Sequence, residues 1–259
     1  MNSQTVLITG ASSGIGLSFS EMFAQQGYSL VLTARNDARL MEIAEQLQTK
    51  YNVHVKTIAQ DLSLSQAPAL LAAELDAQNI TIDILINNAG FAAYGPFTDT
   101  KWEEERDMIT VNITALTELT KRLLPGMVSR NKGKILNVAS TAAFQPGPLM
   151  AIYYATKAYV LSFSEALSYE LRNTNITVTA LAPGATSTNF ESRANLGESR
   201  LFKSGAMSAD EVARAGFNAL MQGKRLVIPG AKNKLLASVV RFLPRKTVLK
   251  IVHYVQDKA

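Results

Sequence analysis

A short apolar run passes directly into a glycine-rich turn over residues 5–16, which read TVLITGASSGIG. A helix-like pattern begins inside that turn. Glycine lets the backbone turn sharply and approach a bound group without a Cβ in the way, while a helix N-terminus offers free N–H groups and a positive dipole end. This order of strand, turn and helix favours a dinucleotide-binding site over an ordinary Gly/Ser turn. The residues of this predicted site are Gly10, Ser12, Ser13, Gly14, Ile15 and Gly16.

The rest of the chain continues the same alternation of short β-branched or aliphatic runs with longer stretches of helical periodicity. This pattern is typical of βαβ units that build a parallel sheet. We expect an α/β fold of the Rossmann type, with a doubly wound, parallel, seven-stranded sheet and helices on both faces. The expected strands are residues 5–9, 29–33, 54–59, 84–87, 134–138, 177–181 and 226–228. The expected helices are residues 15–26, 38–50, 67–78, 102–124, 151–172 and 209–221.

Composition limits the possible classes of protein. The chain has 259 residues, of which 47% are apolar, so it can bury a large core in one domain. It has no cysteine, which excludes disulfide scaffolds, thiolate catalysis and thiolate metal sites. No apolar stretch reaches the roughly 18 residues that a membrane helix needs, and residues 5–9 are too short for a signal peptide. We therefore expect a cytoplasmic protein, and we expect no metal site because His54 and His253 are isolated.

The net charge of +5 is concentrated at the C-terminal end, where residues 224–259 hold nine Lys or Arg against one Asp. The chain lacks a basic face with interleaved aromatic residues, so we expect no nucleic-acid partner. Apolar residues recur at helical spacing around Pro244, which predicts a domain over residues 1–230 and a basic, amphipathic helical extension over 231–259. This extension could face anionic lipid or an acidic acyl carrier, or it could pack as a subunit contact or on the protein's own core.

Two further segments bear on ligand binding. The second expected strand ends in Thr33-Ala34-Arg35, where an acidic residue would instead bind the ribose hydroxyls. Arg35 can pair with a 2′-phosphate, helped by Asn36 and Arg39, so the sequence favours NADP(H) over a role for Arg35 as a solvated surface residue. Residues 186–208 form a polar segment too long for an ordinary connection, and we expect it to act as a lid.

The expected chemical step depends on two residues that open the helix over 151–172. Tyr153 and Lys157 are four residues apart and therefore share one helical face. A phenol titrates near pH ~10, so it can act as an acid or base near neutrality only if a positive charge stabilises its phenolate, and Lys157 is the candidate. Ser140 ends the fifth strand, at the sheet edge where ligands bind. We expect Ser140 to meet the substrate oxygen there.

The Gly-x-x-x-Gly-x-Gly turn, the Tyr-x-x-x-Lys pair and Ser140 together resemble the single-domain branch of the short-chain dehydrogenase/reductase family over about residues 5–230. The resemblance implies that Asn112 joins Ser140, Tyr153 and Lys157 as catalytic residues and anchors a water for proton transfer. It also implies that Tyr153 and Lys157 contact the cofactor. The further cofactor contacts that it implies are Asp61, Leu62, Asn88, Ala89, Gly90, Pro183, Gly184, Thr186 and Thr188.

The implied activity is NADP(H)-dependent reduction of a ketone or aldehyde, or oxidation of the alcohol, in a homodimer or homotetramer. An apolar cavity could be lined by Phe91, Tyr94, Phe97, Phe144, Leu149 and Met150. Such a cavity predicts a hydrophobic substrate, whereas the alternative is that these residues only pack within their loops. The C-terminal extension more distantly resembles the hydroxysteroid dehydrogenase and long-chain oxoacyl reductase group. The alternatives are a catalytically silent NADP(H)-binding sensor or scaffold, and an epimerase or dehydratase, which normally needs a longer chain.

Overall fold

The sheet of this protein, seen in a computed structural model, is parallel and seven-stranded, with the order β3-β2-β1-β4-β5-β6-β9. The structure describes residues 4–188 and 205–257. The strands are β1 (Thr5–Thr9), β2 (Ser29–Ala34), β3 (Val55–Ala59), β4 (Ile84–Asn87), β5 (Gly133–Val138), β6 (Ile176–Leu181) and β9 (Leu226–Val227). The predicted fold class is confirmed. The strand order reverses between β1 and β4, and a ligand crevice forms at such a point beyond the carboxyl ends of the strands.

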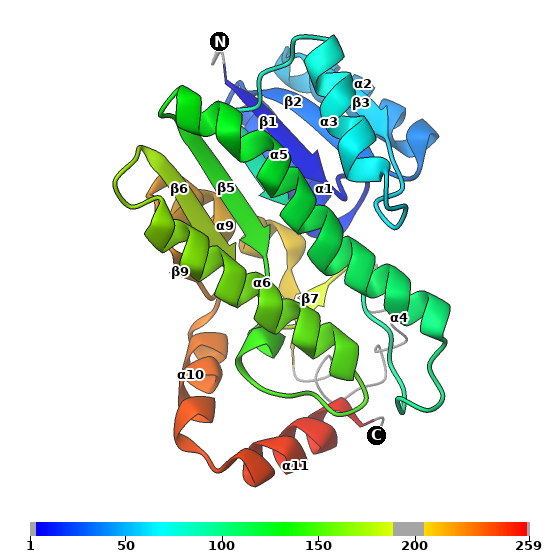
Figure 1. Ribbon diagram of the computed structural model, residues 1–259, viewed down its shortest axis with the longest axis vertical. Helices are drawn as coiled ribbons and strands as arrows, with labels where there is room; N and C mark the ends of the chain where they lie inside the picture. Colours follow the sequence, from blue (N-terminus) through cyan, green and yellow to red (C-terminus); the bar gives the residue numbers. More distant parts are fainter. Residues whose placement is uncertain (1–3, 189–204, 258–259) are drawn as a thin grey trace.

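Helices cover both faces of the sheet because each central strand buries side chains on both sides. Leu7 of β1 packs in one apolar cluster with α3 (Ala67–Ala77), α5 (Leu116–Ser129) and α6 (Ala151–Glu170). Val6 and Ile8 pack in a second cluster with α1 (Gly14–Gln25), α2 (Asp37–Tyr51) and α9 (Ala209–Met221). Figure 1 shows α5 and α6 crossing in front of the sheet.

The region predicted as one helix over 102–124 is divided into three parts. α4 (Trp102–Ile109) passes into a π-helical turn, η1 (Thr110–Ala115), and then into α5. A π turn differs from an α-helix in the spacing of its main-chain hydrogen bonds. The apolar side-chain pattern continues through it, so the sequence does not reveal it. The helix also runs past Pro125 to Ser129, since one missing N–H does not end it. Both differences are corrections to the sequence prediction.

The C-terminal extension forms two short helices on either side of Pro244, as the apolar spacing predicts. They are α10 (Ala231–Val239), followed by the 3₁₀ turn η3 (Val240–Phe242), and α11 (Arg245–Gln256), drawn in orange and red in Figure 1. Within residues 4–188 and 205–257, no helix combines the length and the hydropathy of a bilayer-crossing segment.

A small second sheet, which the sequence did not predict, pairs β7 (Thr186–Ser187) in parallel with β8 (Met207–Ser208). These strands lie at the two ends of the predicted lid over 186–208. Most of that segment lies outside the described residues, so the lid stays a prediction.

Candidate active site

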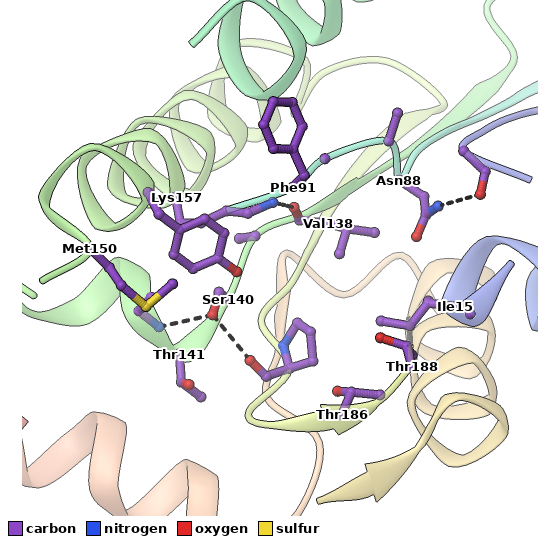
Figure 2. A pocket seen from close by; sticks show the side chains of 18 of the residues that line it. Ile15, Asn88, Phe91, Val138, Ser140, Thr141, Met150, Lys157, Thr186 and Thr188 are labelled. Carbon is purple, nitrogen blue, oxygen red and sulfur yellow. Dashed lines mark hydrogen bonds between the residues drawn. The ribbon is translucent and has the colours of Figure 1, made fainter. Parts of the chain in front are cut away.

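A cavity of about 950 Å³ lies at the carboxyl ends of the strands. Its walls come from the turn after β1, the loops after β2 to β6, α6 and the C-terminal helices, and Figure 2 shows part of this lining. Every predicted catalytic or cofactor residue lines this cavity except Gly16 and Asn112. Segments far apart in the chain therefore bring the predicted residues to one place.

The glycine turn has a shape that larger residues would block. Gly10 has a positive φ of 66°, and a Cβ on Gly16 would lie 2.2 Å from the Gly10 carbonyl oxygen. The Asn88 side-chain Nδ2 donates hydrogen bonds to the carbonyl oxygens of Thr9 (2.9 Å) and Gly10 (3.2 Å), which fixes the turn against β4. Gly16 thus acts from behind the cavity wall by allowing this close packing.

The N-terminus of α1 is open toward the cavity. Its N-cap residue, Ser13, makes no capping hydrogen bond through its side chain, and the first turn contains no acidic residue. Ser12, Ser13, Gly14 and Ile15 all line the cavity. Uncapped N–H groups and the positive end of the helix dipole suit an anion, so these residues fit the diphosphate of a dinucleotide.

Arg35 is an exposed basic residue at the wall of the cavity. It follows β2, lines the cavity, is exposed, and makes no hydrogen bond or ion pair with the described residues. Asn36 also lines the cavity, but its side chain caps α2 by accepting from the Arg39 N–H at 3.0 Å. Arg39 pairs with Glu42 at 2.6 Å and does not line the cavity. Arg39 is therefore not in a position to help Arg35 bind a 2′-phosphate, contrary to the expectation from the sequence.

Tyr153 and Lys157 lie together on α6, as their spacing predicts. Both are buried, and the Lys157 Nζ lies 5.7 Å from the centroid of the Tyr153 ring. Lys157 donates a hydrogen bond to the Val138 carbonyl oxygen at 2.8 Å, which ties α6 to the end of β5. Figure 2 shows Lys157 next to Val138 and Ser140.

Ser140 lies just after β5, where its side chain is held by its own loop. Its Oγ accepts a hydrogen bond from the Ala142 N–H at 3.1 Å and donates one to the Pro183 carbonyl oxygen at 3.4 Å (Figure 2). It also hydrogen-bonds to the Tyr153 side chain. Two hydroxyl groups, from Ser140 and Tyr153, thus meet at the point where a substrate oxygen could accept from both.

Burial controls the ionisation of Tyr153 and Lys157. It raises the pKa of Tyr153 to about 12, and the hydrogen bond with Ser140 opposes this effect. Burial also lowers the pKa of Lys157 to about 8. The sequence argument expected a lowered pKa for Tyr153, but its pKa is raised, because desolvation by burial is the largest cause of the shift. Near neutral pH the phenol is protonated and the lysine is charged, which is the state needed to donate a proton.

Asn112 lies in the π turn η1, and its side chain holds two other segments of the chain in place. Its Nδ2 donates hydrogen bonds to the Phe91 carbonyl oxygen (3.0 Å) and to the Thr156 Oγ1 (3.1 Å), while its Oδ1 accepts from the Phe91 N–H at 3.2 Å. Thr156 in turn donates to the Tyr153 carbonyl oxygen at 2.7 Å. Asn112 therefore joins the loop after β4 to the turn of α6 that carries Tyr153. No motif in the sequence marks Thr156 as a positioning residue.

The loop after β6 forms the remaining cofactor wall. The Thr186 Oγ1 donates to the Gly184 carbonyl oxygen at 3.0 Å, and a Cβ on Gly184 would lie 2.6 Å from the Asn233 Nδ2. Asn233 belongs to α10, lines the cavity, and donates to the Pro229 carbonyl oxygen at 2.9 Å. Sequence reasoning missed Asn233 because nothing in its own segment marks it.

The apolar wall differs from the prediction. Of the six residues expected there, only Phe91 and Met150 line the cavity, and Phe97 is 65% exposed. The C-terminal helices supply the apolar surface instead, because their inner faces turn toward the cavity. The residues concerned are Leu236, Ala237, Val240, Ile251, Val252 and Val255.

Comparisons with known proteins show the family of this chain. The family model of the short chain dehydrogenases matches residues 4–199. A very-long-chain 3-oxoacyl-CoA reductase of Laccaria bicolor is 39% identical over 174 residues, which cover 66% of this chain, and the chain spans only 52% of that relative's length.

Two solved structures are similar over nearly their whole length. A short-chain dehydrogenase from Sphingobium yanoikuyae in complex with NADPH is 37% identical, with a TM-score of 0.83 over 92% of this chain and 94% of that chain. A bulky-bulky ketone specific alcohol dehydrogenase from Comamonas testosteroni is 32% identical, with a TM-score of 0.79 over 93% of each chain. With its fold, its glycine turn and its Ser-Tyr-Lys cluster, this chain belongs to the short-chain dehydrogenase family of oxidoreductases.

Proposed function

We propose that this protein is an NADP(H)-dependent oxidoreductase that reduces a bulky, hydrophobic ketone or aldehyde, or oxidises the corresponding alcohol. The observation that carries the proposal is the meeting of Ser140, Tyr153 and Lys157 in the cavity that the glycine turn also lines. A silent NADP(H)-binding sensor is the less favoured alternative, since binding alone needs no such arrangement.

The proposed mechanism assigns one task to each side chain. Bound NADPH would supply the hydride that adds to the carbonyl carbon. Ser140 and Tyr153 donate hydrogen bonds to the carbonyl oxygen, and Tyr153 transfers its proton as negative charge develops there. The charged Lys157 stabilises the phenolate that results, and it would also hold the nicotinamide ribose of the bound cofactor. Asn112 holds the loop after β4 in place, and its expected role in binding a relay water remains part of this proposal.

The preference for NADP(H) over NAD(H) rests on Arg35. Its guanidinium is exposed beside the cavity and has no ion-pair partner in the described part of the chain, so it can pair with a 2′-phosphate. The loop after β3 offers Asp61 and Leu62 to the adenine. The similar structure from Sphingobium yanoikuyae contains NADPH, which is consistent with this choice.

The substrate class is inferred from the cavity walls. The inner faces of α10 and α11 add apolar side chains opposite the polar cofactor half of the cavity. Such a surface suits a bulky carbonyl compound. Two similar proteins, a bulky-bulky ketone specific alcohol dehydrogenase and a very-long-chain 3-oxoacyl-CoA reductase, have names that fit this inference.

A carbonyl panel tests the proposal. Ketones and aldehydes of rising bulk would be supplied with NADPH and separately with NADH, and turnover followed at the nicotinamide absorbance. We expect turnover to rise with apolar bulk and kcat/KM to be higher with NADPH. Tight NADPH binding with no turnover of any carbonyl or alcohol would favour the silent sensor instead.

The C-terminal helices also present an exposed apolar and basic surface. Phe242 is 86% exposed and Leu235 is 64% exposed, and Lys234, Arg241 and Arg245 lie close to them in sequence. We propose that the protein is a cytoplasmic homodimer or homotetramer in which the 231–259 extension can touch anionic lipid. Sedimentation with anionic and with neutral vesicles tests the lipid contact, and light scattering tests the assembly. Binding to an acidic acyl carrier in place of vesicles would replace the lipid proposal.

A further inference from the structure

The cavity contains a buried polar group that hydride transfer does not use. Gln256, the last residue of α11, is 1% exposed and lines the cavity. Its Nε2 donates a hydrogen bond to the Tyr154 hydroxyl, but its Oε1 is buried and has no hydrogen-bond partner among the described residues. A carboxamide oxygen withdrawn from water normally accepts a hydrogen bond. This oxygen is therefore available to a donor that the described residues do not supply.

A second glutamine in the same cavity has the same property. Gln145 follows the 3₁₀ turn η2 (Thr141–Phe144) and lines the cavity, and its buried Oε1 also lacks a partner in the described part of the chain. Gln145 lies on the segment that leads from Ser140 to α6. Two unsatisfied acceptors in one cavity indicate a feature of the binding site and not an isolated defect in packing.

Gln256 lies on the side of the cavity that carries Tyr153, and Gln145 lies in the loop after β5 that also carries Ser140. Gln256 bonds to Tyr154, whose ring centroid is 6.1 Å from that of the catalytic Tyr153. The glycine turn and Arg35 belong to the loops after β1 and β2, whereas Gln256 comes from α11, which lies at the lower end of the molecule in Figure 1. A group bound to Gln256 would thus belong to the substrate and not to the cofactor.

The position of Gln256 is fixed independently of its side chain. The Tyr94 hydroxyl donates a hydrogen bond to the Gln256 main-chain carbonyl oxygen at 3.1 Å. One turn earlier, Val252 packs against the apolar cluster beneath α6, and Val248 is 4% exposed. The main chain that carries the carboxamide is therefore held in place before a ligand binds. A recognition group that is already ordered does not lose conformational entropy on binding.

We propose that Gln256 and Gln145 form a subsite for a neutral hydrogen-bond donor, a hydroxyl or an amide N–H, on the part of the substrate remote from the reacting carbonyl. Two acceptor oxygens require a donor, and the apolar walls from Leu236, Val240 and Val255 disfavour a charged group. The inference rests on the proposed function and narrows its substrate class. It predicts a bulky apolar ketone that carries a remote hydroxyl or amide.

The test compares three matched ketones with NADPH: one with a remote hydroxyl, its deoxy parent, and its methyl ether. For the wild type we expect kcat/KM for the hydroxy ketone to exceed the other two by about tenfold, the worth of one neutral hydrogen bond, with the difference mainly in KM. In Gln256→Met the ratio of kcat/KM for the hydroxy ketone to kcat/KM for its deoxy parent should fall to about one. Gln145→Met should also lower this ratio. The exposed Gln78, which directly follows α3, gives the control Gln78→Met, which should keep the wild-type preference for the hydroxy ketone.

Two results would overturn the subsite: a wild type that treats the three ketones alike, or a Gln256→Met variant that keeps the full preference. The melting temperature of Gln256→Met verifies folding, because the bond from Tyr94 to the main chain survives the change. If the wild type reduces none of the three, the proposed function fails separately. Calorimetric titration of the hydroxy ketone and of its deoxy parent into the NADP(H)-bound protein then tests the subsite. The subsite predicts that the hydroxy ketone has the lower Kd, by the same factor of about ten.

Discussion

The buried ammonium of Lys157 should make the protein less stable at neutral pH than a variant without it. Burial lowers the pKa of Lys157 from 10.5 to about 8. At about 1.4 kcal/mol per pKa unit, the charged form costs the folded state about 3 kcal/mol. Lys157→Met removes this cost and loses the hydrogen bond to the Val138 carbonyl oxygen, worth about 1 kcal/mol. We expect the variant to be more stable by about 2 kcal/mol at pH 7, or roughly 5 °C in Tm.

The stability difference between the wild type and Lys157→Met should change with pH in one direction. Between pH 8 and 10 the unfolded lysine keeps its proton while the folded Lys157 loses it, so the wild type gains stability relative to the variant as pH rises. The gain is about 1.4 kcal/mol per pH unit, and the advantage of Lys157→Met should vanish near pH ~9.5.

Urea unfolding of both proteins across this range, without cofactor, measures the difference. The exposed Lys121, changed to Met, serves as the control and should follow the wild type at each pH. A variant that is less stable than the wild type at pH 7, or a difference that stays flat up to pH 10, would refute the reasoning.

Three other outcomes follow from the site geometry. Arg35→Glu should reverse the cofactor preference, since a carboxylate repels a 2′-phosphate, as measured by kcat/KM with NADPH and NADH. Gly16→Ala should weaken NADPH binding more than tenfold, because its Cβ would lie 2.2 Å from a main-chain oxygen, and fluorescence titration against Gly126→Ala, where a Cβ meets only a flexible arginine, checks this. Thr156→Val should cost about 1 to 3 kcal/mol in urea unfolding by leaving the buried Asn112 N–H unpaired, whereas Thr156→Ser should not.

The fold and the cofactor cavity were predictable because their signals are local. Each strand and most helices have their own apolar period, and in an open parallel sheet the carboxyl ends of the strands lie at one edge. Ser140 and the glycine turn could therefore be placed together without knowledge of their contacts. Tyr153 and Lys157 were predictable for the same reason, since helical spacing alone puts them on one face.

The remaining features depend on contacts between distant segments. The π turn that holds Asn112 is a matter of main-chain register, which the side-chain pattern does not encode. The raised pKa of Tyr153 comes from burial by the whole fold. Gln256 meets Tyr154 across 102 residues of chain, and Asn233 reaches Gly184 from a helix that no motif marked. The apolar wall was also wrongly placed, because the C-terminal helices lie against the cavity.

The central claim is that the Tyr153 phenol gives its proton to the substrate oxygen beside bound NADPH. Single-turnover oxidation of bound NADPH by a bulky ketone, compared between the wild type and Tyr153→Phe, tests it most directly. The account predicts that the hydride-transfer rate falls by roughly 10² to 10⁴ in the variant while the Kd for NADPH, measured by fluorescence, changes little. A variant that transfers hydride at the wild-type rate would contradict it.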